Sequence, residues 1–331
     1  MIAQLDREYL RLAPGKACGR VVAWALFEGR PLTTRGRWIN PLVFALAGLA
    51  RRAPALARVE RPLFVIGTGR SGTTWLGLLL SLHPDVGFLN EPKALWHSAR
   101  ADEDLIGSYA RGPARVALGS ADATDAARRA LAHGYGAYLR LTGARRVLDK
   151  YPELVHRVAF ARALFPDARF LFLVRDGRAT ARSIAQWSAT HGRPGAEDWW
   201  GRADRKWRVL CSELVPREPD LAPRAAALLA LERPAERAAL EWVLAMRAGL
   251  RAEREHAGAV LRVGYEELCR DPGSTLERVL AHCGLAPSDR VLEYARRTAV
   301  PAAAEISSES LALPPDLARA FEALQRDLGY G

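Results

Sequence analysis

The sequence predicts an α/β protein with a doubly wound parallel sheet, flanked by helices and preceded by a helical N-terminal extension. Short, nearly continuous apolar runs of the kind that form strands buried on both faces recur along the chain. Segments with helical spacing lie between these runs. Strands that alternate with helices form right-handed β-α-β units, and such units build a parallel sheet.

The predicted elements follow in order along the chain. Residues 1–60 are expected to form a mainly helical extension, and residues 61–331 the α/β domain. Apolar runs predict strands at 62–67, 86–89, 146–149, 169–174 and 259–263. Helical spacing predicts helices at 75–80, 154–165, 177–187, 235–256 and 275–283. Ligands bind at the carboxyl ends of the strands in such sheets, so the residues that follow each strand are the candidate site.

The composition indicates a globular protein. Of the 331 residues 49% are hydrophobic, and 48 Lys+Arg against 37 Asp+Glu give a net charge of +11. Only four of the cations are lysines, and codon bias explains the arginine excess as well as an anion-binding surface does; the lysines are Lys16, Lys93, Lys150 and Lys206. The four cysteines lack the C-x-x-C spacing of a zinc or redox site.

The N-terminal region has the pattern of neither a secretion signal nor a membrane span. Charges run through residues 1–11, and the longest apolar run, 38–50, is shorter than the roughly 20 residues of a spanning helix. We therefore expect a cytoplasmic protein. Because arginines flank the apolar run, residues 30–52 would suit peripheral contact with an anionic membrane, but a helix that packs on the main domain explains the run as well. Without a zinc-finger or RNP signature or a lysine-rich tail, we expect no nucleic-acid partner.

The turn after the first strand is a candidate anion site. It reads Gly67-Thr68-Gly69-Arg70-Ser71-Gly72-Thr73-Thr74 and has the glycine spacing of a nucleotide P-loop, so the predicted sheet is P-loop-like. Glycines let backbone N–H groups and a helix N-terminus converge on one anion, and the arginine and hydroxyls add donors. Thr73 stands in place of the P-loop lysine that reaches the β- and γ-phosphates, which disfavours a kinase or NTPase.

Three segments in consistent order resemble the sulfotransferases that use 3′-phosphoadenosine 5′-phosphosulfate (PAPS). Residues 70–76 resemble the 5′-phosphosulfate-binding loop of that family. Arg175, with Ser183 eight residues later, resembles its 3′-phosphate-binding pair. Residues 263–268 with the following Asp-Pro resemble its late strand and YEEL…P segment. The resemblance covers about residues 61–285 and is closer to the tyrosylprotein and carbohydrate/lipid branches than to the cytosolic hormone and phenol branch.

One element of the hormone and phenol branch is missing. Its C-terminal R-K-G loop, which grips the 3′-phosphate and adenine, has no counterpart here, and residues 302–313 occupy that stretch. The residues that would replace this loop stay open; Ser307, Ser308 and Ser310 are weak candidates.

The resemblance implies an enzyme that moves a sulfuryl group from PAPS to a hydroxyl of a glycan, lipid or tyrosine and releases PAP (3′,5′-ADP), without a metal. By analogy with phosphoryl transfer, we expect in-line transfer with cations at the leaving oxygen and a base for the acceptor. A P-loop kinase and a non-enzymatic anion- or membrane-binding protein are the alternatives. The acceptor and the oligomeric state stay open, and we expect residues 1–60, 93–145 and 188–225 to build the acceptor pocket.

The predicted catalytic residues are Arg70, Lys150 and Glu91. Lys150 ends a strand, matches the lysine of the tyrosylprotein branch, and as a compact cation suits a sulfuryl oxygen. Glu91 also follows a strand and would accept the acceptor proton if burial raises its pKa. His97 is the rival base, and His83 a weaker one.

The remaining site residues are predicted to bind the donor. They are the loop residues Arg70, Ser71, Gly72, Thr73, Thr74 and Trp75, then Arg175 and Ser183 for the 3′-phosphate, and Tyr265, which would pack on the nucleotide. Four tryptophans near strand ends are candidates for an acceptor surface, although most tryptophans at such positions are core: Trp96, Trp187, Trp199 and Trp200.

Overall fold

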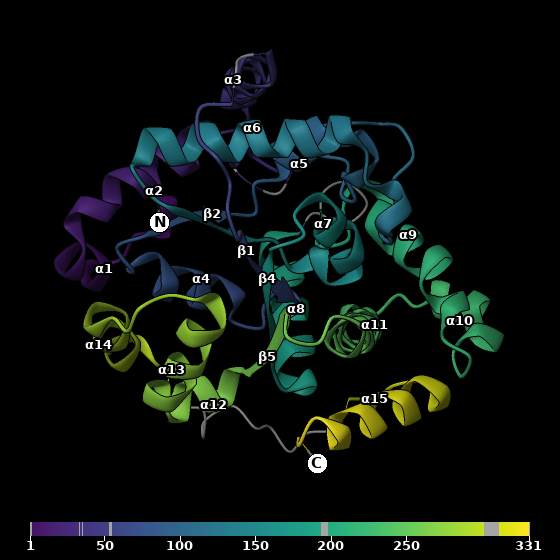
Figure 1. Ribbon diagram of the computed structural model, residues 1–331. Coiled ribbons are helices and arrows are strands. Elements are labelled where there is room, and N and C mark those ends of the chain that lie inside the picture. The colour runs from purple at the N-terminus through teal and green to yellow at the C-terminus, as the bar shows by residue number, and fades with distance from the viewer. Residues whose placement is uncertain are drawn as a thin grey trace.

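The computed structural model describes residues 2–32, 34, 36–52, 55–192, 198–300 and 311–330. A five-stranded sheet in the order β2-β3-β1-β4-β5 forms its centre (Figure 1). Every neighbouring pair is parallel, which confirms the predicted fold class. The strands are β1 (Leu63–Gly67), β2 (Val86–Asn90), β3 (Arg146–Lys150), β4 (Arg169–Val174) and β5 (Val260–Gly264).

From the central strand β1 the chain passes to the edge strand β2, returns to β3 beside β1, and then crosses to β4 and β5 on the other side. The order therefore reverses at β1, and the crevice at the carboxyl end of β1 is where an open α/β sheet binds its ligand. In the pairing of β2 with β3, Asn90 lies opposite Lys150. These two strands consequently end at the same level of the sheet edge.

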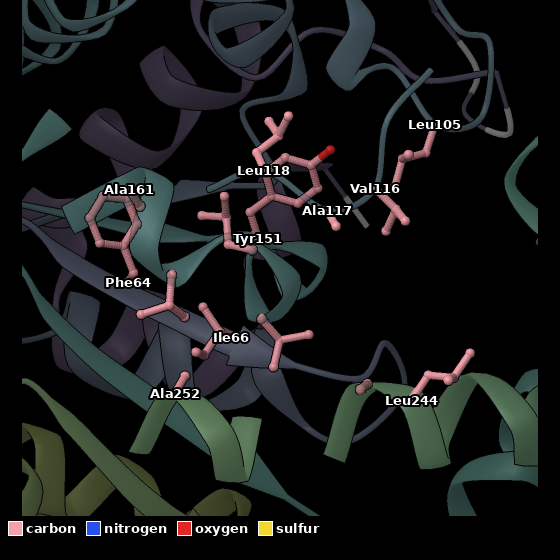
Figure 2. Packing of buried hydrophobic residues seen from close by; sticks show 14 of the residues in the cluster. Phe64, Ile66, Leu105, Val116, Ala117, Leu118, Tyr151, Ala161, Leu244 and Ala252 are labelled. Atoms are coloured by element: carbon pink, nitrogen blue, oxygen red, sulfur yellow. The ribbon is translucent and has the colours of Figure 1, made fainter. Parts of the chain in front are cut away.

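Side chains alternate between two apolar layers, as expected for a strand buried on both faces. One layer contains Phe64 and Ile66 of β1, which Figure 2 shows with Tyr151 and with Ala252 of α11. The other contains Leu63 and Val65. Helices that supply residues to the first layer are α2 (Pro14–Leu26), α3 (Asn40–Arg52), α5 (Lys93–Ala99), α6 (Asp125–Thr142), α7 (Val158–Leu164), α8 (Gly177–His191), α9 (Arg205–Glu213), α10 (Ala225–Leu229), α11 (Pro234–Glu255) and α15 (Pro315–Asp327). Those of the second layer are α1 (Arg7–Leu12), α4 (Thr73–Ser81), α12 (Tyr265–Arg270), α13 (Pro272–Cys283) and α14 (Asp289–Thr298).

The N-terminal segment is helical, as the sequence predicted, and it packs on the sheet. Its helices α2 (Pro14–Leu26) and α3 (Asn40–Arg52) contact β2 and α6 respectively. The buried Arg20 of α2 donates to the carbonyl of Phe88 at 2.5 Å and to Glu28 at 2.7 Å. A domain boundary at residue 60 stays a prediction.

Two predicted helices differ from the observed ones. The helix expected at 154–165 is divided into a 3-10 turn, Pro152–His156, and α7. Arg157 separates the two because its buried guanidinium binds distant partners, the carbonyl of Val116 at 2.9 Å and Glu103 at 3.1 Å. The helix expected at 177–187 continues to His191.

Candidate functional site

A cavity of about 710 Å³ lies at the carboxyl ends of β1, β2 and β3. Its walls come from the glycine-rich turn, from the strand ends and from each of the three segments that the sequence predicted to build an acceptor pocket. Residues 24–34 contribute Trp24 and Arg30, residues 93–145 contribute Lys93, and residues 188–225 contribute Trp199 and Lys206.

The turn between β1 and α4 is shaped as an anion cradle. Gly67 and Gly72 have φ of +144° and +92°, and a Cβ at either would lie within 2.6 Å of the Leu173 carbonyl oxygen or 2.4 Å of the Tyr265 ring. Because helix α4 begins directly after Gly72, its first N–H groups face outward without intrahelical acceptors. Ser71 is buried, donates its hydroxyl to the Thr68 carbonyl at 2.5 Å and does not line the cavity.

Arg70, Arg175 and Ser183 meet at one place. The Nη1 of Arg175 donates to the Arg70 carbonyl at 2.9 Å, and the Nε of Arg70 donates to Ser183 Oγ at 3.2 Å. The Arg175 guanidinium also lies 4.6 Å from the centre of the Tyr265 ring. Burial and then the charge of Arg175 lower the pKa of Arg70, as expected where two cations share a site that takes anions.

The aromatic residues of the donor segments frame the turn. Trp75 donates its Nε1–H to Thr298 Oγ1 at 2.9 Å and meets Tyr265 edge to face, with ring centres 5.9 Å apart. Trp75 and the predicted loop residues Gly72, Thr73 and Thr74 line the cavity, whereas Tyr265 supports the turn from behind.

Glu91 and Lys150 are joined at the end of the β2–β3 pair. The backbone N–H of Glu91 donates to the Lys150 carbonyl at 2.7 Å, and Lys150 Nζ donates to Glu91 Oε1 at 2.5 Å. Lys93 Nζ lies 3.3 Å from the second oxygen, Oε2. Glu91 has a φ of +50°, a left-handed backbone that is uncommon for a residue with a Cβ.

The electrostatics of Glu91 differ from the sequence-based expectation. Burial by itself would raise the pKa of this carboxyl, but the charges of Lys150 and Lys93 outweigh burial and lower the pKa. The expectation that burial raises the pKa of Glu91 is therefore wrong. The carboxylate is therefore ionised at neutral pH, and the two ammonium groups that hold it in that state also make it a weaker base than a free carboxylate.

Sequence reasoning missed a chain of alternating charges that continues from Glu91. Lys93 lies 3.6 Å from Glu153, and Glu153 lies 3.7 Å from Lys206. Lys206 in turn donates to Glu241 at 2.7 Å. The signal was present in the composition, because three of the four lysines line this cavity.

The four candidate tryptophans divide into two groups. Trp187 and Trp199 line the cavity with ring centres 5.3 Å apart, and a Cβ at Gly69 would lie 2.6 Å from Trp199. Trp96 and Trp200 are core residues, each 1% exposed. Trp199 and Trp200 both donate to Glu241 Oε2 at 3.0 Å, which connects the aromatic wall to the charge chain.

The two rival bases lie away from the cavity. His97 packs against the rings of Phe44 and Tyr109 and does not line it. His83 is bound between the Ala286 carbonyl and the Asp85 N–H. Glu91 is the candidate base that lines the cavity. The serines 307, 308 and 310 lie outside the described residues.

The lining fits a ligand with two separated anionic groups. Arg70 and Arg175 lie at the turn, and Lys150 lies at the neighbouring strand end. Asn90, which also lines the cavity, has a buried Oδ1 without a hydrogen-bond partner among the described residues, as does the Oγ1 of Thr68 in the turn. Buried polar atoms of this kind are normally satisfied by a ligand or water.

The chain is similar to known proteins. Residues 62–225 match the model of the Sulfotransferase family. Nodulation protein NoeE of Sinorhizobium fredii (strain NBRC 101917 / NGR234) is 31% identical over 241 residues, which are 71% of this chain and 52% of NoeE. Protein-tyrosine sulfotransferase of Drosophila melanogaster is 32% identical over 133 residues, which are 38% of this chain and 25% of that protein. The chain thus spans about half the length of NoeE and less of the Drosophila protein. The solved sulfotransferase domain from the curacin biosynthetic pathway superposes with a TM-score of 0.49 at 14% identity, over 83% of this chain and 99% of that domain.

Proposed function

The chain belongs to the sulfotransferase family, and we propose that it transfers a sulfuryl group from PAPS to a hydroxyl acceptor held in the cavity. The observation that carries this proposal is the convergence of Glu91, Lys150 and Arg70 on one cavity beside the glycine-rich turn. The three residues come from two strand ends and one loop that are far apart in the sequence.

The glycine-rich turn, Arg70 and Arg175 would bind the donor PAPS. The N–H groups at the start of α4 and the Arg70 side chain would hold the 5′-phosphosulfate. Arg175 and Ser183 would hold the 3′-phosphate, because a guanidinium binds a phosphate through two parallel N–H donors. PAPS itself supplies the activated sulfuryl group, and PAP is the leaving group.

The transfer needs a proton acceptor and cations at the leaving oxygen. A carboxylate oxygen of Glu91 takes the proton of the acceptor hydroxyl while that hydroxyl forms its bond to sulfur and the bond from sulfur to the phosphate oxygen breaks. Lys150 and Arg70 stabilise the charge that develops on the phosphate oxygen. Because Lys150 also binds Glu91, any shift of its ammonium toward the leaving group weakens its hold on the carboxylate and raises the pKa of the base as the proton arrives.

The acceptor is a hydroxyl compound, and its class is a glycan, a lipid or a tyrosine. The faces of Trp187 and Trp199 suit a sugar ring or a phenol, since both present an apolar surface with a polar edge. The protein-tyrosine sulfotransferases among the relatives make tyrosine the first acceptor class to test.

Thermal unfolding with three nucleotides tests the donor. PAP at 100 times its Kd should stabilise the fold by about 2.7 kcal/mol and raise Tm clearly. At the same concentration 5′-AMP should raise Tm less, and Mg-ATP should not raise it. Stabilisation by Mg-ATP in preference to PAP would revive the kinase alternative and overturn the proposal. Transfer of ³⁵S from labelled PAPS into a cell extract, fractionated into lipid, glycan and protein, then identifies the acceptor class.

A further inference from the structure

Helix α3 and the turn before it present an apolar face to solvent. Trp38 is 83% exposed, Leu42 50% and Leu49 62%. Leu42 and Leu49 are seven residues apart, so they lie on the same side of α3, and Trp38 precedes Leu42 by one turn. We call Trp38, Leu42 and Leu49 the outer face. Helix α3 lies at the periphery of the molecule, beyond α6 (Figure 1).

Protein packing does not account for this outer face. Val43 and Ala47, on the opposite side of α3, are buried and face α5 and α6. The helix is therefore apolar on the side that packs and on the side that does not. A cluster of exposed large apolar side chains on a folded protein marks an interaction surface.

The charge around the outer face specifies the partner. Between Glu28 and Glu60 the chain contains no acidic residue. The same stretch contains six arginines, of which Arg30 is buried and Arg51, Arg52 and Arg58 are exposed. An apolar face with a tryptophan at one end and flanking arginines is the pattern of a helix that lies in the interface of an anionic bilayer.

We propose that the outer face of α3 docks on an anionic lipid surface. None of the described helices is both long enough and apolar enough to span a bilayer, so the contact is peripheral. Trp38, Leu42 and Leu49 enter the boundary between headgroups and acyl chains, and the arginines at the ends of the helix bind the lipid phosphates.

The same segment forms a wall of the cavity. Arg30 lines the cavity, and the side-chain amide of Asn40, the first residue of α3, binds both backbone groups of Arg30. The Arg30 N–H donates to Asn40 Oδ1 at 2.7 Å, and Asn40 Nδ2 donates to the Arg30 carbonyl at 3.0 Å. Because α3 is fastened to the cavity wall, docking would hold the cavity beside the bilayer. This connection, which rests on the proposed function, assigns the acceptor to hydroxyls carried at a lipid surface.

Sedimentation with vesicles tests the docking without donor or acceptor. The full chain should sediment with vesicles of 30% phosphatidylserine in phosphatidylcholine and not with phosphatidylcholine alone, and high salt should weaken the binding. The variant Trp38→Ser/Leu42→Ser/Leu49→Ser should bind at least about tenfold more weakly. The matched control is Leu229→Ser, since Leu229 is an exposed leucine of α10, and it should bind as the unaltered chain does.

A second pair of variants tests how much the arginine charge contributes to vesicle binding. Arg52 and Arg254 are exposed and each lies in the last turn of a helix, α3 and α11. Arg52→Gln should weaken vesicle binding about fivefold and Arg254→Gln should not, because one cation near an anionic surface contributes about 1 kcal/mol. Equal binding of the triple variant and the unaltered chain overturns the proposal. A second result would also overturn it: the unaltered chain forms a concentration-dependent dimer, does not bind vesicles, and loses the dimer in the triple variant. The outer face would then contact a second copy of the chain.

Labelled transfer separates this inference from the proposed function. With the lipid fraction of a cell extract, as the source of hydroxyl-bearing lipids, incorporated into vesicles of 30% phosphatidylserine, the triple variant should lose ³⁵S incorporation into lipid while it binds PAP as the unaltered chain does. Equal incorporation by both proteins overturns the link between docking and the acceptor. If the unaltered chain does not bind PAP, the proposed function is wrong, whereas the result of the vesicle experiment still holds.

Discussion

Lys150 Nζ lies 2.5 Å from Oε1 of Glu91, although 59 residues separate them in the sequence. The contact exists because β2 and β3 are neighbouring parallel strands that end at the same level. A single ion pair thus places the candidate base and the candidate electrophilic cation in contact, with Lys93 on the far side of the carboxylate.

Glu91→Gln should abolish transfer and spare donor binding. The amide keeps the size of the side chain but does not accept a proton, so the transfer rate should fall about a hundredfold or more. Rates with labelled PAPS and PAP titrations measure the two effects. The control Glu267→Gln, at an exposed carboxylate paired with Arg278, should leave both unchanged. Undiminished turnover by Glu91→Gln would remove this residue as the base.

Lys150→Met should change the pH dependence of transfer as well as its rate. The Lys150 charge lowers the pKa of Glu91, so its removal raises that pKa. A carboxylate base works above its pKa, and the acidic limb of the pH–rate profile should therefore move to higher pH. Lys150→Arg keeps the charge and should leave that limb in place while the rate falls about tenfold. An unmoved limb in the methionine variant would contradict the coupling.

Arg175→Gln and Ser183→Ala should weaken PAP binding more than 5′-AMP binding. A hydrogen bond to a charged group contributes about 1.5–3 kcal/mol, so we expect roughly a tenfold to hundredfold loss for the arginine and a smaller loss for the serine. Arg178→Gln is the control, since Arg178 lies on the same helix α8 and pairs with Glu322 outside the cavity. Calorimetric titration of both nucleotides gives the comparison. Equal losses for PAP and 5′-AMP would place the 3′-phosphate elsewhere.

Asp149 should make the stability fall as the pH rises. Burial raises its pKa to about 7, while its carboxyl accepts from Trp96 Nε1 at 2.8 Å and from the Tyr135 hydroxyl at 2.5 Å. Between about pH 4 and pH 7 the folded state therefore holds a proton that the unfolded chain has released. This group should lower the free energy of unfolding by about 2 kcal/mol between pH 5.5 and pH 8.

Asp149→Asn tests that expectation, because an amide oxygen still accepts both hydrogen bonds. Urea unfolding at the two pH values should give a smaller loss of stability for the variant than for the unaltered chain. Glu103, whose pKa burial also raises to about 7, contributes in the same direction and keeps part of the slope. Identical slopes for the two proteins would show that Asp149 is charged in both states.

The strands were predictable because their signal is local. Residues 170–174 form an unbroken apolar run after Arg169, and β4 has the predicted limits, Arg169–Val174. The prediction of one helix at 154–165 was wrong, because the guanidinium of Arg157 donates hydrogen bonds to Glu103 and to the Val116 carbonyl, which are distant in the sequence. Spacing within a segment carries no information about such partners.

The candidate site shows the same limit. The residues that follow strands were identified because parallel strands end at one edge. The direction of the Glu91 pKa shift was not predicted correctly, because it depends on how many cations surround the carboxylate in space. The chain from Lys93 through Glu153 and Lys206 to Glu241 also joins segments that only the fold brings together.

The scarcity of lysine makes the few amines of the chain distinguishable by their reactivity. Lys93, Lys150 and Lys206 supply its ε-amines, and each is paired with a carboxylate that a bound anion would compete with. The fourth, Lys16, is outside the cavity, bound to the Pro84 and Val86 carbonyls, with its pKa lowered to about 8 by burial. The three cavity lysines are buried, and the carboxylates of Glu153 and Glu91 raise the pKa of Lys93 despite that burial. An amine-reactive reagent should therefore modify Lys16 first, and peptide mass spectrometry would report any variant in which a cavity lysine loses its carboxylate partner and becomes reactive.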